Sequence, residues 1–405
     1  MRVLYFHQHF VTPKGAGAIR SYAMARKLVE RGHSVTMVCG SNTTGTTGLE
    51  GEFTGGKRRG LVGGIDVIEL DLAYSNNDGF MKRVWTFLSF AFRSIWIALT
   101  EKYDLVFATT TPLTAGIPGI FARWLRRKPF VFEVRDLWPE LPREMGVINN
   151  PVVLWVMEGL EWSSYRSAHR LVGLSPGIVE GITKRNVPSE RVAMVPNGCD
   201  LDIFTDSAKP WRPHGIADTD LMAIFAGTHG IANGLDAVLD AAGELKKRGR
   251  DDIKFLLIGS GKLKPALMAK AERNGLDNVV FHDPVKKSEL AGLMRATDIG
   301  MQILANVPAF YYGTSPNKFF DYIAAGVPVL NNYPGWLAEM IEQEQCGYAV
   351  PPADPVAFAD ALEQAAAQRD QLLVMGKRAK ALAEREFDRD KMANEWLDWV
   401  TGAVQ

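Results

Sequence analysis

Short apolar runs alternate with amphipathic stretches in the first half of the chain. Residues 2–6 (RVLYF) predict a buried parallel strand, and a glycine-containing loop, a helix over 21–32 and a second strand over 34–40 follow. This order is the βαβ unit of parallel sheets. Further strands are predicted at 65–70, 104–109, 129–134 and 170–174. The alternation predicts a layered α/β domain, whereas residues 41–64 lack periodicity and predict a mobile loop.

The same pattern begins again near residue 221, where strands and helices alternate as far as the run VPVLNN. The sequence therefore predicts two doubly wound α/β domains in series. The first is expected over residues 1–200 and the second over 201–386. A last amphipathic segment, 387–405, is expected to pack back on the first domain.

Composition narrows the class of protein. The 405 residues are 47% hydrophobic and 23% charged, which is typical of soluble globular proteins. Basic and acidic residues balance at 46 each, but residues 1–200 hold 24 basic and 18 acidic residues. This excess suggests an anionic partner and is too small to predict nucleic-acid binding. Three scattered cysteines argue against zinc or disulfide frameworks and fit a cytoplasmic protein. The first residues resemble a strand and not a signal peptide, and no 18-residue apolar run would span a bilayer.

A glycine loop, Gly15-Ala16-Gly17, lies between the first strand and helix. Such loops bind phosphate through exposed N–H groups, although an ordinary turn remains the alternative. The dinucleotide pattern G-x-G-x-x-G is broken at Arg20, and the strand over 34–40 lacks a terminal acid. Both departures argue against an NAD dehydrogenase.

The segment GTSPNKFFDYIAAGVPVL is the most informative motif. It places Ser315, Asn317 and Lys318 at a predicted helix start, where free N–H groups and an ammonium favour an anion. Asp321, one turn later, is a candidate acceptor for two sugar hydroxyls. Simple N-capping by Ser315 or Asn317 is the alternative. The pair Asp200/Asp202 is too common a pattern in this chain to predict a metal site.

The chain resembles the retaining nucleotide-sugar glycosyltransferases of family 4, which have the GT-B fold of two Rossmann-like domains facing across a cleft. The resemblance rests on KGAGAIRSYAMA, PNGCDLDIF, FAGTHGIANGLDAVLDAA, LLIGSGKLKPAL and SPNKFFDYIAAGVPVL. The front half, with FEVRDLWPE, resembles the bacterial polysaccharide and O-antigen subgroup of N-acetylfucosamine-type transferases.

This resemblance implies a reaction. A sugar, expected to be an N-acetylated deoxyhexose, would move from a UDP-sugar to a polyprenyl-diphosphate-linked saccharide in bacterial surface polysaccharide or lipopolysaccharide synthesis. It implies front-face attack, with the donor phosphate taking the proton, and neither a cofactor nor a metal is expected. A nucleotide-sugar epimerase on the same fold and a catalytically silent sugar-nucleotide-binding scaffold subunit remain alternatives.

The donor site departs from the family pattern. The family's E-x₇-E motif would place glutamates where Gly313 and Asp321 stand, and the usual Arg and Lys of an earlier loop are replaced by His229 and Asn233. The donor-binding residues predicted are Gly15, Gly17, His229, Asn233, Gly259, Ser315, Asn317, Lys318 and Asp321.

The segment FEVRDLWPE supplies the acceptor candidates. Glu133, Arg135 and Asp136 follow a strand, where ligands of doubly wound sheets bind, and Arg135 stands where the family often has a histidine. Arg135, Asp136 and Lys318 are the predicted catalytic residues. A structural ion pair between Arg135 and Asp136 is the alternative.

Two basic–aromatic segments, 80–99 and 123–128, predict contact with an anionic membrane surface. Trp85, Phe87, Arg93 and Trp124 are the predicted contact residues, and a core-facing helix is the alternative. The protein is therefore expected at the inner face of the bacterial plasma membrane, as a peripheral cytoplasmic enzyme.

Overall fold

The computed structural model describes residues 1–15, 19–42, 46–75, 78–205 and 207–404. The chain divides into two compact units, which are described separately. Unit 1 comprises Met1–Asn197, Gly313–Ser315 and Asp390–Gln405, and unit 2 comprises Gly198–Tyr312 and Pro316–Arg389. No helix among the described residues is long and apolar enough to cross a membrane.

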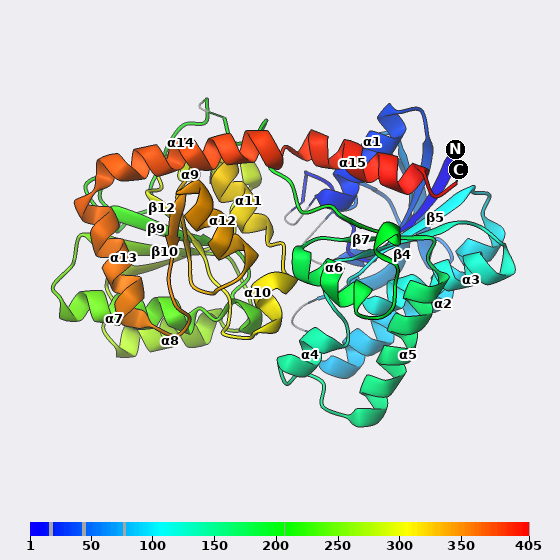
Figure 1. Ribbon diagram of the computed structural model, residues 1–405, viewed down its shortest axis with the longest axis horizontal. Helices are drawn as coiled ribbons and strands as arrows, with labels where there is room; N and C mark the ends of the chain where they lie inside the picture. Colours follow the sequence, from blue (N-terminus) through cyan, green and yellow to red (C-terminus); the bar gives the residue numbers. More distant parts are fainter. Residues whose placement is uncertain (16–18, 43–45, 76–77, 206, 405) are drawn as a thin grey trace. The chain divides into compact units, whose positions relative to one another are not determined.

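Unit 1 is built on an eight-stranded sheet in the order β3-β4-β2-β1-β5-β6-β7-β8. Figure 1 labels β4, β5 and β7 of this sheet. Its strands are β1 (Arg2–Phe6), β2 (Ser34–Asn42), β3 (Lys57–Val62), β4 (Ile65–Tyr74), β5 (Leu105–Thr109), β6 (Phe130–Val134), β7 (Arg170–Gly173) and β8 (Val192–Met194). Neighbouring strands are parallel except β3, which is antiparallel to β4.

The prediction of a loop over residues 41–64 is wrong for 57–62, which form β3. This edge strand lacks the apolar alternation that marks a half-buried strand. Its arginines instead pair across the ladder with acids of β4: Arg58 with Glu69 at 2.9 Å and Arg59 with Asp66 at 2.6 Å. Charged side chains are typical of sheet edges because they discourage pairing with other chains.

Helices cover both faces of this sheet. They are α1 (Arg20–Glu30), α2 (Phe80–Thr100), α3 (Ile117–Leu125), α4 (Glu140–Glu144), α5 (Pro151–Ser167), α6 (Pro176–Thr183) and α15 (Arg389–Thr401). Because side chains alternate along a strand, Leu4 and Phe6 pack in the core beneath α2, α3, α5 and α6, whereas Val3 and Tyr5 pack toward α1 and α15. Trp396 of α15 lies 4.8 Å from the Phe107 ring, centroid to centroid.

Unit 2 has a six-stranded parallel sheet in the order β11-β10-β9-β12-β13-β14. Its strands are β9 (Leu221–Ala226), β10 (Ile253–Ile258), β11 (Val279–His282), β12 (Ile299–Gln302), β13 (Val329–Asn331) and β14 (Gly347–Ala349). Its helices are α7 (Asp236–Lys247), α8 (Lys264–Arg273), α9 (Lys287–Arg295), α10 (Ala309–Gly313), α11 (Asn317–Ala324), α12 (Trp336–Glu344), α13 (Pro355–Ala367) and α14 (Arg369–Glu386).

Both sheets confirm the predicted doubly wound α/β class. In each, the strand order reverses beside the first strand, between β1 and β5 in unit 1 and between β9 and β12 in unit 2. Ligands of such sheets bind outside the carboxyl ends of the strands at this reversal. The residues that follow β1, β5, β6, β9 and β10 are therefore the candidates for ligand binding.

Candidate active site

Lys318 lies at the start of α11 and reaches the loop that follows β9. Its ammonium Nζ donates to Oδ1 of Asn233 at 2.9 Å and lies 4.9 Å from the centroid of the Phe225 ring. No carboxylate among the described residues pairs with it. Burial lowers the pKa of Lys318 from its usual value to about 8. A partly buried cation whose partners among the described residues are an amide and an aromatic ring is suited to an anionic ligand.

Glycines allow the loops around Lys318 to approach closely. A Cβ on Gly227 would lie 3.3 Å from the Lys318 Cε atom. Gly259, after β10, has φ +148, and a Cβ there would lie 1.8 Å from the Gly227 carbonyl oxygen. Only glycine permits this approach, so Gly259 shapes the loop next to the Lys318 site.

His229 is a buried, neutral residue in the same loop. Its ring lies between those of Phe225 and Phe281, with centroid separations of 6.1 and 6.2 Å. Neither ring nitrogen has a hydrogen-bond partner within the described ranges. Burial lowers the pKa of His229 to about 4. The side chain packs under the loop, and its predicted contact with a donor stays a prediction.

The first turn of α11 has no side-chain cap, so the N-capping alternative for Ser315 and Asn317 is wrong. The cap residue is Pro316. The oxygens of Ser315 instead accept hydrogen bonds from Asn197: the backbone N–H of Asn197 donates to Oγ at 3.0 Å, and its Nδ2 donates to the carbonyl at 2.6 Å. N–H groups at the start of α11 are thus left without a cap, as in anion-binding helix ends.

Asp321 belongs to a largely buried network of charges within unit 2. Lys287 of α9 lies 3.2 Å from Oδ1 of Asp321 and also pairs with Asp200, which Arg389 contacts in turn. Burial raises the pKa of Asp321. Burial also disfavours ionised Asp200, but Arg389 and Lys287 hold the pKa of Asp200 below its usual value. Asp200 is therefore committed to two cations. Within the described part of the chain, no cluster of three or more His, Cys, Asp or Glu side chains offers a metal site.

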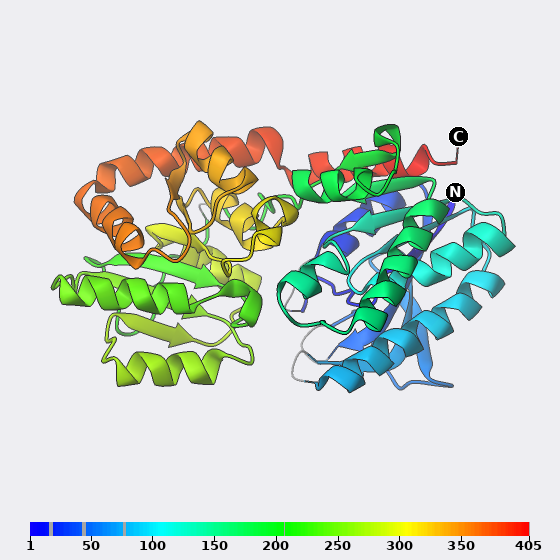
Figure 2. The same cartoon turned by 60° about the horizontal axis from the view of Figure 1, so that its bottom comes forward.

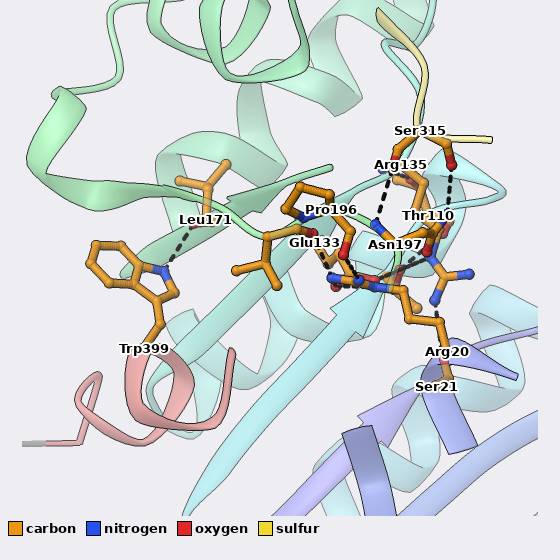
Figure 3. A network of polar contacts seen from close by, with 12 residues as sticks. Arg20, Ser21, Thr110, Glu133, Arg135, Leu171, Pro196, Asn197, Ser315 and Trp399 are labelled. Carbon is orange, nitrogen blue, oxygen red and sulfur yellow. Dashed lines mark hydrogen bonds and ion pairs between the residues drawn. The ribbon is translucent and has the colours of Figure 1, made fainter. Parts of the chain in front are cut away.

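The carboxyl ends of β5 and β6 in unit 1 carry a second network, drawn in Figure 3. Arg20 and Glu133 pair at 2.9 Å and are both almost completely buried. The other Glu133 oxygen accepts from Thr109 at 2.8 Å and from Nε of Arg135 at 3.1 Å. Burial disfavours ionised Glu133, yet the two arginines hold its pKa below the usual value. Arg135 also donates to Ser21 at 2.7 Å.

The alternative prediction of an ion pair between Arg135 and Asp136 is wrong, because Arg135 pairs with Glu133 instead. Asp136 accepts a hydrogen bond from Thr111 at 3.0 Å, and burial raises the pKa of Asp136. Gly15 forms a bend in which its N–H donates to the Thr12 carbonyl at 3.0 Å. Gly17 lies outside the described residues.

The sequence did not predict three residues that contribute to these sites. Arg20 was visible only as the residue that breaks a glycine motif, Asn197 stood only within the segment PNGCDLDIF, and nothing in the sequence marked Lys287. One feature of the sequence could have indicated a buried cation. Glu133 lies inside the apolar run of β6, and an unpaired buried carboxylate is costly.

Helices α2, α3 and α5 lie side by side on unit 1, with α3 packed against both neighbours (Figures 1 and 2). Their solvent face is unusually aromatic: Trp85 is 71% exposed and Trp124 61% exposed. Further exposed apolar residues are Met81, Phe92, Trp96, Leu125, Val152, Trp155, Val156 and Trp162. These residues are called the aromatic face below.

Phe87 and Arg93 lie differently from the two predicted tryptophans. Phe87 is half-buried and stacks on Tyr74, with ring centroids 5.6 Å apart. Arg93 is exposed and donates to the Gly56 carbonyl at 3.2 Å. A core-facing stripe also exists on α2, but it consists of other residues: Thr86, Phe90, Ala91, Ser94, Ile97 and Ala98.

Comparison with known proteins defines the class. The family described as "Glycosyl transferase 4-like domain" matches residues 15–198, and "Glycosyl transferases group 1" matches residues 221–368. Together these matches cover well over half of the chain. The chain therefore belongs to the glycosyltransferases of this type, and its fold is that of the GT-B enzymes.

Individual relatives are more distant. The chain is 30% identical over 239 residues to a D-inositol 3-phosphate glycosyltransferase of Xylanimonas cellulosilytica, covering 53% of this chain and 52% of the relative. It is 23% identical over 269 residues to WcaL of Escherichia coli K12, a putative colanic acid biosynthesis glycosyltransferase, covering 62% and 64%. The chain thus spans about half to two thirds of the length of these relatives.

Solved structures share the fold over nearly the whole chain. Sucrose-phosphate synthase from Thermosynechococcus elongatus has a TM-score of 0.73 at 17% identity, covering 99% of this chain and 98% of the other. HepE of Anabaena in complex with UDP and glucose has a TM-score of 0.69 at 16% identity, covering 99% and 100%. WaaG, a glycosyltransferase involved in lipopolysaccharide biosynthesis, has a TM-score of 0.67 at 16% identity, covering 99% and 100%.

Proposed function

We propose that the protein transfers a sugar from a nucleoside diphosphate donor to a hydroxyl group of a lipid-linked saccharide, with retention at the anomeric carbon. The partly buried ammonium of Lys318 is the observation that carries this proposal. It stands at a helix start after the strand reversal of unit 2, with no carboxylate partner among the described residues. A diphosphate supplies the missing negative charge.

The chemistry needs charge stabilisation more than a protein nucleophile. When the sugar leaves the donor, negative charge grows on the departing diphosphate. The ammonium of Lys318 is a fixed charge, and the uncapped N–H groups of α11 are fixed dipoles. Both stabilise this group without rearrangement. Retention through front-face attack, the absence of a metal requirement and uridine as the base are part of the proposal. The UDP and glucose bound by the similarly folded HepE support a nucleotide-sugar donor.

The proposed acceptor site lies at the carboxyl ends of β5 and β6. Nε and Nη2 of Arg135 are committed to neighbouring side chains, whereas no hydrogen bond of Nη1 is found among the described residues. Nη1 is the group we assign to an acceptor phosphate or hydroxyl. Asp136 has one oxygen bound to Thr111, and we assign the other to the attacking acceptor hydroxyl. Glu133 then acts indirectly, since it holds Arg135 and is itself fully buried.

The aromatic face suits a lipid surface. Three tryptophans in particular, Trp85, Trp96 and Trp155, are each more than 70% exposed, and exposed tryptophans partition into the headgroup region of bilayers. Arg93 and Arg127 are exposed cations on α2 and immediately after α3. We therefore propose peripheral attachment to the inner face of the bacterial plasma membrane, where a polyprenyl-diphosphate-linked saccharide is presented. An N-acetylated deoxyhexose remains the predicted sugar. The similarity to WcaL, a putative colanic acid biosynthesis glycosyltransferase, and to WaaG, which is involved in lipopolysaccharide biosynthesis, supports a role in surface polysaccharide synthesis.

The direct test combines binding and turnover. Purified protein is screened by thermal shift against nucleoside diphosphates and their sugars, because a ligand of the folded state raises the melting temperature. The donor that binds is then incubated alone and with lipid-linked saccharides. Acceptor-dependent release of the nucleoside diphosphate supports the transferase. Conversion of the donor alone would indicate the epimerase, and binding without turnover the scaffold subunit.

Membrane attachment is tested separately by sedimentation with anionic vesicles. The variant Trp85→Ser/Phe92→Ser/Trp96→Ser should lose most vesicle binding, since three aromatic side chains no longer enter the interface. Leu373→Ser is the matched control, because Leu373 is 68% exposed but lies on α14, outside the aromatic face. Equal sedimentation of the triple variant and the control would contradict the proposed surface.

A further inference from the structure

The chain leaves unit 1 directly after Asn197 and returns to it for three residues, Gly313–Ser315, before unit 2 resumes at Pro316. Asn197 binds this short return segment twice. Its backbone N–H donates to the Ser315 hydroxyl at 3.0 Å, and its side-chain Nδ2 donates to the Ser315 carbonyl at 2.6 Å (Figure 3). Asn197 is only 5% exposed. Two hydrogen bonds between one pair of residues fix direction as well as distance.

The residues before Asn197 are themselves held by Arg20. The guanidinium of Arg20 donates to the carbonyls of Pro196 at 2.5 Å and Val195 at 2.9 Å. Its Nε and Nη2 atoms also donate to Glu133, which in turn accepts from Arg135. One uninterrupted set of hydrogen bonds and covalent steps therefore runs from Arg135 to Ser315, entirely within unit 1.

The chain between Ser315 and α11, the helix that carries Lys318, has little conformational freedom. Pro316 is the N-cap of α11, with φ −76, and Lys318 is the second residue of the helix. Proline fixes its own φ and restricts the residue before it. A displacement of Ser315 is therefore passed on to the start of α11 and to the Lys318 backbone.

We propose that Asn197 is a positioning residue for sugar transfer: its two hydrogen bonds fix Ser315, and Ser315 leads directly into the helix that carries Lys318. This inference rests on the proposed function. The donor diphosphate is assigned to Lys318, and transfer requires the ammonium to be aligned with the leaving group while negative charge develops on it. Misplacement by about 1 Å costs on the order of 100-fold in rate. Loss of the hydrogen bonds between Asn197 and Ser315 therefore slows transfer and leaves donor binding intact.

The test separates turnover from binding. Asn197→Ala removes the Nδ2 donor and keeps the backbone N–H, and Asn197→Asp keeps the shape but turns an acceptor toward the Ser315 carbonyl. We expect kcat for transfer to fall by about 10-fold in the alanine variant and about 100-fold in the aspartate variant. The Kd of the nucleoside diphosphate and the KM of the donor should stay within about threefold of the unsubstituted protein.

Asn394→Ala is the matched control. Asn394 also lies in unit 1 and accepts a hydrogen bond from Arg31 at 2.9 Å, but this contact is exposed and unconnected to Ser315. Its kcat should not change. The inference is overturned if both Asn197 variants keep kcat within about threefold of the unsubstituted enzyme. It is also overturned if kcat, nucleotide affinity and melting temperature fall together, because that is the signature of a merely structural residue. If the unsubstituted protein turns over no donor at all, the proposed function fails first and this inference with it.

Discussion

Two cations, the partly buried Lys318 in unit 2 and the buried Arg20 in unit 1, lie near the carboxyl ends of central strands and have opposite surroundings. Arg20 is matched by the Glu133 carboxylate and two backbone carbonyls. Lys318 has an amide oxygen and an aromatic ring. A buried charge without a counter-charge is costly, so its retention favours a ligand that supplies one. The comparison favours a structural role for Arg20 and supports the proposed chemical role of Lys318.

Replacing Lys318 should have the largest effect on activity. Lys318→Met keeps much of the side-chain volume and removes the charge, so transfer should fall by about 100- to 1,000-fold, as when a fixed donor to a developing anion is lost. The melting temperature should stay equal or rise, because a desolvated charge has been removed. Steady-state kinetics and calorimetry measure the two effects.

Lys270→Met provides the control for this substitution. Lys270 pairs with Asp236 and Asp240 at a more exposed site of the same unit, at 2.7 and 3.0 Å. Its loss should leave transfer unchanged. A Lys318→Met enzyme with normal turnover, or one that melts well below the unsubstituted protein, would reverse the assignment of the two cations.

Replacing Arg20 should instead affect stability first. Arg20→Met leaves Glu133 buried beside Arg135 alone, and breaking a buried ion pair from one side costs about 3–5 kcal/mol. Chemical unfolding should show this loss. The double variant Arg20→Met/Glu133→Gln removes the buried carboxylate as well and should recover part of it. If the double variant is less stable by the full sum of its two single losses, the pair is not the source of the effect.

The difference between the two cations also explains what the sequence could reveal. Apolar runs and glycine turns predicted both sheets, because strand burial and turn geometry are local properties. Lys318 was recognised because its motif places it at a helix start. Arg20 and Asn197 were missed because their partners, Glu133 and Ser315, are 113 and 118 residues away along the chain. Spacing cannot report such pairings. The stacking of Phe87 on Tyr74 could not be predicted for a related reason, because these two residues lie on separate elements, α2 and β4.

The pH dependence of nucleotide binding should identify Lys318 again. Burial lowers its pKa to about 8 in the ligand-free protein. The ammonium is present below this pH and lost above it, so affinity for a nucleoside diphosphate should be constant near pH 7 and weaken by up to about tenfold per unit above pH 8. Calorimetric titration between pH 6.5 and 9.5, about the range in which this group changes charge, measures it. Binding that is flat across this range in the unsubstituted protein would contradict the assignment.

The smallest expected effect concerns Asp321. Its ion pair with Lys287 resembles the Arg20–Glu133 pair, because each charge has a counter-charge, whereas Lys318 has no carboxylate partner among the described residues. If Asp321 also accepts from two ribose hydroxyls, Asp321→Asn should weaken nucleoside diphosphate binding by about five- to tenfold, since charge-assisted hydrogen bonds become neutral. Inorganic pyrophosphate, which has no ribose, should bind equally to both proteins. Asp240→Asn, at an exposed ion pair with Lys270, is the control. Equal losses for the nucleotide and pyrophosphate would show that Asp321 acts through Lys287 and the helix, and would place it with the architectural charges.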